Sequence, residues 1–444
     1  MSSDHWGARP ATAPAHVPAR PLDPLRLLRA APHRVTRAAF RAACVSLLLY
    51  AAVRHVVAVS MVDMVVYRAE GAAVLHGSDL YSFHVTHWGL PATYPPFAAI
   101  AFGPAALVDV PVLRVLVTGG NLVLLGVVAW QSCELADWPR RPMRPAAVMV
   151  ATGFGVWLEP VFTTLSYGQI NLALAALVLS DLNRRRGGRR WRGAAIGVAA
   201  GLKITPGFFV LYLLVTGQWR AARNAALTCV GTVGIGGLLL PRASWDYWTS
   251  YLWQTSRVGH EYIVDNQSLR GMLDRALHTV DADPWALGAS VIVAAGGLVL
   301  ARTLHRADGL PRSRAWAAMC CAVTMVLVSP ISWTHHWIWC VPLIVLLAAE
   351  AAHERRAGLT RRWRATAVAA VVGFCSFSMW LVPHKGLTNL KIPTALQPAS
   401  SLYPLMGLAF LALAALQARC DRRQTASRAP VPRQRQEQQA AALN

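Results

Sequence analysis

The sequence predicts an all-α, polytopic membrane protein. Of its 444 residues, 55% are hydrophobic and 14% are charged, whereas a soluble domain carries about 25% charged residues. The net charge of +22 comes from arginines that lie in short clusters between long apolar runs. Such clusters are typical of the cytosolic loops of membrane proteins, so they argue against nucleic acid as a partner.

A spanning helix needs about 20 predominantly apolar residues. The candidate segments are 39–59, 96–110, 113–131, 145–160, 168–182, 193–215, 222–240, 286–304, 315–329, 336–350, 365–382 and 402–418. Several are short or contain proline or polar residues, and a membrane tolerates such breaks only where the backbone faces protein or a watery cavity. We therefore expect about 11–13 transmembrane helices and leave the exact count open.

The arginine clusters orient the chain. They lie around 184–192, 220–223, 302–314 and 355–364. The positive-inside rule places these loops in the cytosol. The remaining loops are then external, and they are 60–95, 241–285, 330–335 and 383–401. The two longest of them, 60–95 and 241–285, therefore share one side of the membrane.

Two regions conflict with this orientation. If 193–215 were one span, Arg192 and Arg220 would lie on opposite sides of the membrane. Two half-length helices that meet near Lys203–Pro206 would keep both arginines in the cytosol. The region 96–131 also gives an even number of crossings where the charges require an odd number.

The chain divides into a disordered cytosolic tail over 1–38, a membrane domain over 39–420 and a second disordered cytosolic tail over 421–444. The N-terminal tail lacks the pattern of a cleavable signal peptide, and the C-terminal tail is polar and rich in Gln and Arg. The eight cysteines show no CxxC spacing, so we expect no disulfide, no metal site and no other cofactor.

Asp63 lies just past the first predicted span, on the external side. A carboxylate at a membrane border is costly to desolvate and is usually functional or paired, and Arg54 or Arg68 could be its partner. Two interpretations stay open: a solvated interfacial acid, or a general base at the mouth of a cavity. Glu70 and Asp79 are weaker candidates for that base.

Gln169 and Asn171 begin an apolar helix. Amides in a bilayer often only join helices, but groups that both donate and accept hydrogen bonds also suit sugar hydroxyls. Tyr94 lies in the rigid, extended segment Thr-Tyr-Pro-Pro at 93–96. We count all three side chains as candidate sugar-binding or acceptor-binding residues.

Lys203 lies between apolar runs, so its ammonium group faces a cavity or a counter-ion unless it extends to the interface. A helix end beside an ammonium group makes a good phosphate site. His335 and His336 lie at the external end of a later span, flanked by tryptophans. Adjacent histidines diverge on a helix, so they favour a hydrogen bond to phosphate or sugar, or a structural pair, over a metal site.

The external loop 241–285 is rich in Trp and Tyr, which fits an interfacial belt and also suits stacking on sugars. Asn266 and Gln267 precede Ser268 there, and we include the two amides among the candidate acceptor-binding residues. The serine could simply cap the amphipathic segment that follows. The external side thus collects an acid, a cation, histidines, amides and aromatic rings, which suit sugar transfer from a lipid phosphate.

An ordered set of motifs from about Val62 to Pro342 resembles glycosyltransferase family 87, whose members have the polytopic GT-C fold. The motifs are D-x-x-V-Y-x-x-x-x-x-A-x-x-x-G-x-x-L-Y from Asp63, T-Y-P-P at 93–96, G-Q-I-N at 168–171, G-L-K-I-T-P at 201–206, N-Q-S-L-x-G at 266–271 and S-P-I-S-W-T-H-H-W at 329–337. The family resembles actinobacterial cell-envelope enzymes that build phosphatidylinositol mannosides or lipomannan from polyprenyl-phosphate mannose.

The resemblance implies that Asp63 is the catalytic residue of a cell-membrane enzyme whose active site faces outward. Asp63 would deprotonate a hydroxyl of a glycolipid or glycan acceptor, and attack on a β-linked polyprenyl-phosphate mannose would give an α-mannoside by inversion. Lys203 and one of His335 or His336 would hold the phosphate. A polyprenyl phosphate leaves readily, so no metal is required.

Three alternatives stay open. A related branch of the family transfers arabinofuranose from a polyprenyl phosphate, and the motifs do not separate the two sugars. A sugar-lipid transporter would show inverted repeats, and none is evident in the sequence. A structural membrane scaffold would leave the Asp, Lys, His and amide side chains on one side unexplained.

Overall fold

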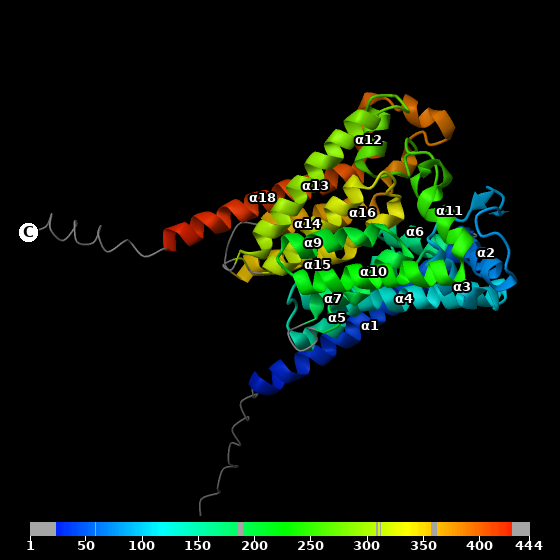
Figure 1. The fold of residues 1–444 in the computed structure, drawn as a ribbon. Coiled ribbons are helices and arrows are strands. Elements are labelled where there is room, and N and C mark those ends of the chain that lie inside the picture. The colour runs from blue at the N-terminus through cyan, green and yellow to red at the C-terminus, as the bar shows by residue number, and fades with distance from the viewer. Residues whose placement is uncertain are drawn as a thin grey trace, which may run out of the picture.

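The structure is a computed structural model that describes residues 24–428 apart from 58, 185–189, 308, 309, 311 and 357–361. The described chain is a bundle of α-helices with one two-stranded hairpin, in which β1 (His84–Val85) pairs antiparallel with β2 (Leu90–Pro91) (Figure 1). The all-α, polytopic fold class is therefore confirmed.

The helices of the first half are α1 (Pro24–Val57), α2 (Val62–His76), α3 (Pro96–Ala106), α4 (Val110–Leu135), α5 (Arg144–Gly155), α6 (Glu159–Tyr167), α7 (Asn171–Asn183), α8 (Ala194–Leu202) and α9 (Phe208–Val215). Those of the second half are α10 (Trp219–Leu239), α11 (Pro241–Thr249), α12 (Leu269–Ala276), α13 (Asp283–His305), α14 (Ser313–Val328), α15 (Cys340–Arg356), α16 (Arg362–Cys375), α17 (Gln397–Ser400) and α18 (Leu402–Arg428). Short 3-10 turns are η1 (Arg141–Met143), η3 (Thr205–Gly207), η4 (Tyr251–Trp253), η5 (Thr255–Arg257), η6 (Thr334–Trp339), η7 (Ser378–Leu381), η8 (Gly386–Lys391) and η9 (Thr394–Leu396).

The helix α14 forms the centre of the bundle, because all its residues from Ala315 to Leu327 are buried. The outer helices α1, α10 and α13 instead expose large apolar side chains, among them Leu48, Leu238 and Ile292. An apolar outer surface of this kind suits contact with lipid.

Five helices of the described chain are long and apolar enough to cross a membrane, which are His33–Val57, Val110–Leu135, Asp283–His305, Thr334–Arg355 and Leu402–Cys420. The count becomes six if Arg141–Gly155 and Glu159–Tyr167, which meet at 70°, form one broken span. This criterion yields fewer spans than the predicted number of about 11–13, because several apolar segments form helices of only 10–17 residues.

The segment 193–215 is one of these broken regions. The helix α8 ends before Lys203, which is extended at φ −151° and ψ 130°. Gly193 lies against Ala221, and Gly201 lies against Thr232, so α8 and α10 run in parallel. The helix α9 must therefore bring the chain back.

A hydrogen bond from Arg192 to Gln218 closes the return. This packing confirms the prediction that two half-length helices keep Arg192 and Arg220 on one side of the membrane.

The second conflict, over 96–131, has a similar solution. The helix α3 has 11 residues, so it is about 16 Å long and cannot cross a hydrocarbon layer of about 30 Å. It packs instead against α2, where Gly71 approaches the Phe102 carbonyl group. The helix α4 is then the one helix of spanning length in this region, which gives the odd number of crossings.

The two longest loops of the predicted external side lie together. Arg257 donates to the carbonyl oxygens of Tyr81 at 3.0 Å and Ala92 at 3.4 Å, and the Tyr81 ring stacks on Tyr247. In Figure 1, α2 and α11 lie at the right of the bundle, whereas α1 begins and α18 ends at the left. The prediction that 60–95 and 241–285 share one side is confirmed.

The predicted tails fall largely outside the described residues, which exclude 1–23 and 429–444. The helix α1 begins at Pro24 and α18 ends at Arg428, so both helices extend into segments assigned to the tails over 1–38 and 421–444.

The close contact between α8 and α10 can be tested at Gly197. A Cβ atom there would lie 2.4 Å from the Ala225 carbonyl oxygen. Gly197→Ala should therefore lower the free energy of unfolding by about 1–3 kcal/mol, seen as a lower thermal midpoint of the detergent-solubilised protein. Gly234→Ala in α10 is the control, because nothing lies within 4 Å of its Cβ position. Equal midpoints for the two variants would contradict the packing.

Candidate active site

Asp63 lies in the first turn of α2, and this turn is fixed against the junction of α6 and α7. The Met61 amide group donates to the Ser166 carbonyl oxygen at 3.0 Å. Gly168 has φ +72°, and a Cβ atom there would lie 2.7 Å from Met64. The close approach lets the Gln169 amide donate to the Asp63 carboxylate at 2.6 Å.

The expected arginine partners of Asp63 bind elsewhere. Arg54 donates to the Leu165 carbonyl oxygen, and Arg68 donates to those of Val108 and Ala106. The partner of Asp63 is the neutral amide of Gln169, so the carboxylate is not neutralised by an ion pair with either arginine.

Gln169 connects Asp63 to two tyrosines. Its Oε1 atom accepts from Tyr67 at 2.7 Å and from Tyr94 at 3.3 Å, and the two phenol oxygens lie 2.8 Å apart. Tyr94 was predicted from the sequence as a site residue, whereas Tyr67 was not. The place of Tyr67 in the D-x-x-V-Y motif, one helical turn after Asp63, was a signal that it lies on the same face of the helix as Asp63.

Lys203 lies at the other end of this network, at the break between α8 and η3. Its ammonium group lies 3.3 Å from the Tyr94 oxygen, 3.4 Å from Asn171 Oδ1 and 2.9 Å from His336 Nε2. The phenol and the amide are neutral, and so is His336 when its ring carries a single proton. Among the described residues, no carboxylate forms an ion pair with Lys203. The site therefore carries an uncompensated cation, which suits an anionic ligand.

The two adjacent histidines face different groups. His336 Nε2 accepts from Lys203, so its neutral ring carries the proton on Nδ1. The His335 ring lies edge-on to Tyr167, with 5.6 Å between centroids, and at 89° to the His336 ring. The divergence expected from the sequence is confirmed. The His335 carbonyl oxygen also accepts from Asn171 at 3.0 Å, which holds this segment against α7.

Asn266 and Gln267 do not join the network. The Asn266 amide donates to the carbonyl oxygens of Glu261 and Pro330, and the Gln267 amide donates to those of Val264 and Ser400. Their side-chain oxygens accept from backbone amides. Both side chains thus stabilise the loop through internal hydrogen bonds, and their predicted contact with the acceptor stays a prediction.

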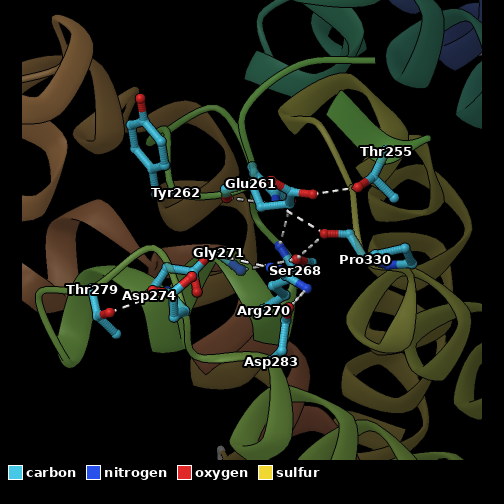
Figure 2. Close-up of polar contacts among 12 residues, drawn as sticks. Thr255, Glu261, Tyr262, Ser268, Arg270, Gly271, Asp274, Thr279, Asp283 and Pro330 are labelled. Atoms are coloured by element: carbon cyan, nitrogen blue, oxygen red, sulfur yellow. Dashed lines mark hydrogen bonds and ion pairs between the residues drawn. The ribbon is translucent and has the colours of Figure 1, made fainter. Parts of the chain in front are cut away.

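The remainder of this motif is also structural. Ser268 caps α12 by accepting from Gly271 N at 3.1 Å and donates to the Pro330 carbonyl oxygen, as Figure 2 shows. Arg270 extends to Asp283 at the start of α13. The capping interpretation of Ser268 is therefore confirmed. The motif at 266–271 also fixes the end of the external loop against residues 329–333.

A pocket opens beside the Lys203 end of the network. Its empty volume is about 410 Å³, including the part open to solvent. Lys203, Asn171 and His336 form its polar end, and its apolar lining includes Leu174 and Met325. A pocket with a cation at one end and apolar walls suits a ligand that joins an anionic group to a hydrocarbon chain.

Burial raises the pKa of Asp63 to about 6, and the hydrogen bond from Gln169 and the charge of Lys203 act in the opposite direction. A carboxylate with this pKa is mostly ionised at neutral pH yet basic enough to accept a proton. Burial likewise raises the pKa of Glu70, to about 8. Glu70 accepts from the Thr93 amide at 3.4 Å and so helps to place the segment that carries Tyr94.

Among the described residues, no three His, Cys, Asp or Glu side chains are grouped closely enough to hold a metal ion.

Comparison with known proteins gives a consistent result. The family description of glycosyltransferase family 87 matches residues 92–330. A polyprenol-phosphate-mannose-dependent alpha-(1-2)-phosphatidylinositol mannoside mannosyltransferase of Mycobacterium tuberculosis is 33% identical over 318 residues, which cover 67% of this chain and 72% of that protein. Its namesake in Mycolicibacterium smegmatis is 35% identical over 324 residues, with the same coverage.

A phosphatidylinositol pentamannoside mannosyltransferase of M. smegmatis, with the same donor and linkage in its name, is 33% identical over 352 residues, or 77% of this chain and 80% of that protein. No solved structure matches the chain.

The hydrogen bond from Gln169 predicts how the Asp63 carboxylate titrates. Gln169→Met removes the donor, so the pKa of Asp63 should rise by roughly one unit, because a hydrogen bond to a charged group contributes about 1.5 kcal/mol. Infrared difference titration would follow the protonated carboxyl band, with Asp63→Asn to identify it. The control is Gln254→Met, because Gln254 is exposed. An unchanged or lowered pKa in Gln169→Met would show that the bond does not stabilise the ionised form.

Proposed function

Because this chain belongs to glycosyltransferase family 87, we propose that it transfers mannose from a polyprenyl-phosphate donor to a phosphatidylinositol mannoside or related cell-envelope glycolipid. The chain is an enzyme, a membrane glycosyltransferase. The donor and acceptor of this proposal are those in the names of its relatives. The observation that carries the proposal is the continuous network from Asp63 through Gln169 and Tyr94 to Lys203.

Asp63 is the general base of the proposed reaction. Its carboxylate takes the proton of an acceptor hydroxyl, and the hydroxyl oxygen forms a bond to C1 of the mannose. The bond between C1 and the phosphate oxygen breaks, and its electron pair leaves with the polyprenyl phosphate. Attack opposite the leaving group inverts C1, so a β-linked donor yields an α-mannoside.

Lys203 stabilises the leaving phosphate. The hydrogen-bond partners of its ammonium group are neutral, so no carboxylate neutralises the positive charge. That charge can therefore stabilise the negative charge that develops on the phosphate oxygen. His336 lies beside it and can donate from Nδ1. The apolar lining of the adjacent pocket, including Leu174 and Met325, would take the first part of the prenyl chain.

The neutral side chains between base and cation suit the sugar itself. Tyr94, Gln169 and Asn171 both donate and accept hydrogen bonds, as mannose hydroxyls do. Tyr94 donates to Gln169, and Asn171 donates to the His335 carbonyl oxygen and accepts from Lys203, so these buried polar atoms are paired within the protein. Binding of the donor would exchange some of these internal hydrogen bonds for bonds to the sugar.

The proposed site faces the outside of the cell membrane. Support comes from the distribution of charge, because the arginine clusters lie in loops that the positive-inside rule assigns to the cytosol. Asp63 lies in the loop region 60–95, which packs against 241–285 and carries none of those clusters. Both substrates have lipid anchors, so they would reach the site from the membrane.

Replacement of the proposed base gives the first functional test. Asp63→Asn keeps the size of the side chain but cannot accept the proton, so transfer should fall by about 10²–10⁴-fold. Transfer of labelled mannose from polyprenyl-phosphate mannose measures this, with binding of the donor expected to be unchanged. Asp281→Asn is a matched control at an exposed position. Full activity in Asp63→Asn, or transfer only from polyprenyl-phosphate arabinofuranose, would refute the proposal.

The pH dependence gives a second test. Asp63 must be ionised to accept a proton, and its pKa is raised to about 6. The kcat/KM for the acceptor should therefore be constant at neutral pH and fall tenfold for each pH unit well below about 6. The Asp63→Asn enzyme should lack this acidic limb in its residual activity. A wild-type limb near pH 4 would indicate an unburied carboxylate and contradict the assignment.

A further inference from the structure

Several buried polar atoms of the described residues have no hydrogen-bond partner, and two of them belong to residues near the network: Oδ1 of Asp265 and Nε2 of His335. Most buried polar atoms in folded proteins are paired, so each exception calls for an explanation. Neither atom is among the groups proposed to bind the donor phosphate, which are Lys203 and His336.

The backbone beside Asp265 is bonded to the segment that precedes His335. Asn266 pairs with Trp333 in an isolated antiparallel bridge, and the Gln267 amide donates to the Ser332 carbonyl oxygen at 2.8 Å. This pairing places residue 265 next to Thr334, at the start of the segment that carries His335. The bridge therefore sets the position of Asp265 relative to the histidine segment.

A buried arginine stabilises the same loop from behind. Arg275 is 0% exposed, and its guanidinium group donates to the carbonyl oxygens of Ile263 at 2.8 Å and Asn266 at 3.0 Å and to the Ser401 hydroxyl at 3.0 Å. Two of these bonds flank Asp265 on either side along the chain. Arg275 thus fixes the loop while leaving the Asp265 carboxylate oxygen unpaired.

Tyr167 joins the two unpaired atoms to the site. Its ring contacts His335 edge-on, with 5.6 Å between centroids. The charges of both Asp265 and Asp63 act on its phenol group. Tyr167 is also two residues before Gln169, which binds Asp63. The patch therefore adjoins the proposed base through Tyr167.

The charges around Asp265 select the kind of ligand. Burial and the neighbouring Glu159 raise the pKa of Asp265 to about 6, whereas His384 and Arg275 act in the opposite direction. Asp265 is thus mostly ionised at neutral pH. The carboxylates of Asp265 and Glu159 would repel a phosphate. A carboxylate is, however, a strong acceptor for the hydroxyl groups of a neutral polyol.

We infer that Asp265, Tyr167 and His335 form an acceptor subsite that binds ring hydroxyls of the acceptor sugar. This inference rests on the proposed function and adds the place of its second substrate. The Asp265 carboxylate accepts from sugar hydroxyls, and His335 Nε2 forms a further hydrogen bond. The adjacent histidines then serve different substrates, since His336 faces the donor phosphate and His335 faces the acceptor.

The decisive variant is Asp265→Asn, which keeps the shape of the side chain and removes its charge. We expect the acceptor KM for a phosphatidylinositol mannoside to rise at least tenfold, with the KM for polyprenyl-phosphate mannose and the thermal midpoint unchanged. Asp281→Asn, at an exposed position of the neighbouring loop, should leave all three quantities unchanged. An acceptor KM within twofold of wild type, or equal increases in both KM values, would overturn the subsite.

A series of monodeoxy mannoside acceptors adds a readout that a structural role would not move. Wild type should lose at least tenfold in kcat/KM with the analogue that lacks the hydroxyl bound by Asp265, and Asp265→Asn should lose nothing further. The same loss in both enzymes would contradict the contact. If Asp265→Asn does not fold, Tyr167→Phe takes its place in the KM comparison, with the same expected and contradicting outcomes.

Acceptor binding without donor separates this inference from the proposed function. Calorimetry would measure the Kd of a phosphatidylinositol mannoside for wild type and Asp265→Asn. Weaker binding to the variant, together with no mannose transfer by wild type, would refute the proposed reaction and support the subsite. Normal transfer by wild type with equal binding to both proteins would refute the subsite alone.

Discussion

The site depends on one constraint, which is that a cation and a carboxylate lie in an apolar bundle without forming an ion pair. Lys203 and Asp63 are joined only through neutral groups, in the order Tyr94 and Gln169. A direct ion pair between them would satisfy both charges and leave neither for a ligand. The amide and the phenol instead stabilise each charge by hydrogen bonding and keep the two charged groups from pairing directly.

The sequence predicted the fold class and the shared side of the loops 60–95 and 241–285, since both follow from composition and from the placement of arginine. It did not predict the number of spans. Apolar length alone does not show whether a helix crosses the membrane, and the placement of the short helices α3 and α8 depends on contacts with other segments. Gly201 approaches Thr232 of α10, and Gly71 approaches Phe102 of α3. Contacts of this kind are set by the tertiary packing and are absent from a hydropathy pattern.

The sequence predicted the site better where residue chemistry was unusual for a membrane. A lysine and an aspartate stand out there, and the structure brings Lys203 into contact with His336 and Asp63 into contact with Gln169. Amides gave a weaker signal, because Asn266 is as polar as Asn171, yet Asn171 contacts Lys203 whereas the Asn266 amide donates to backbone carbonyl oxygens away from the network. Asp265 was missed for the converse reason. An acid in a polar loop looks solvated, and only the structure shows that its oxygen is buried.

The shortfall in spanning helices and the site have the same physical origin. The network lies where helices are interrupted: Gly168 separates α6 from α7, Lys203 separates α8 from η3, and Trp337 carries non-helical angles within η6. Irregular backbone at membrane depth persists only where it is buried in protein or lines a cavity. The breaks that made the spans hard to count therefore lie at the residues that carry the network from Asp63 to Lys203, which holds the proposed base and the proposed phosphate-binding cation.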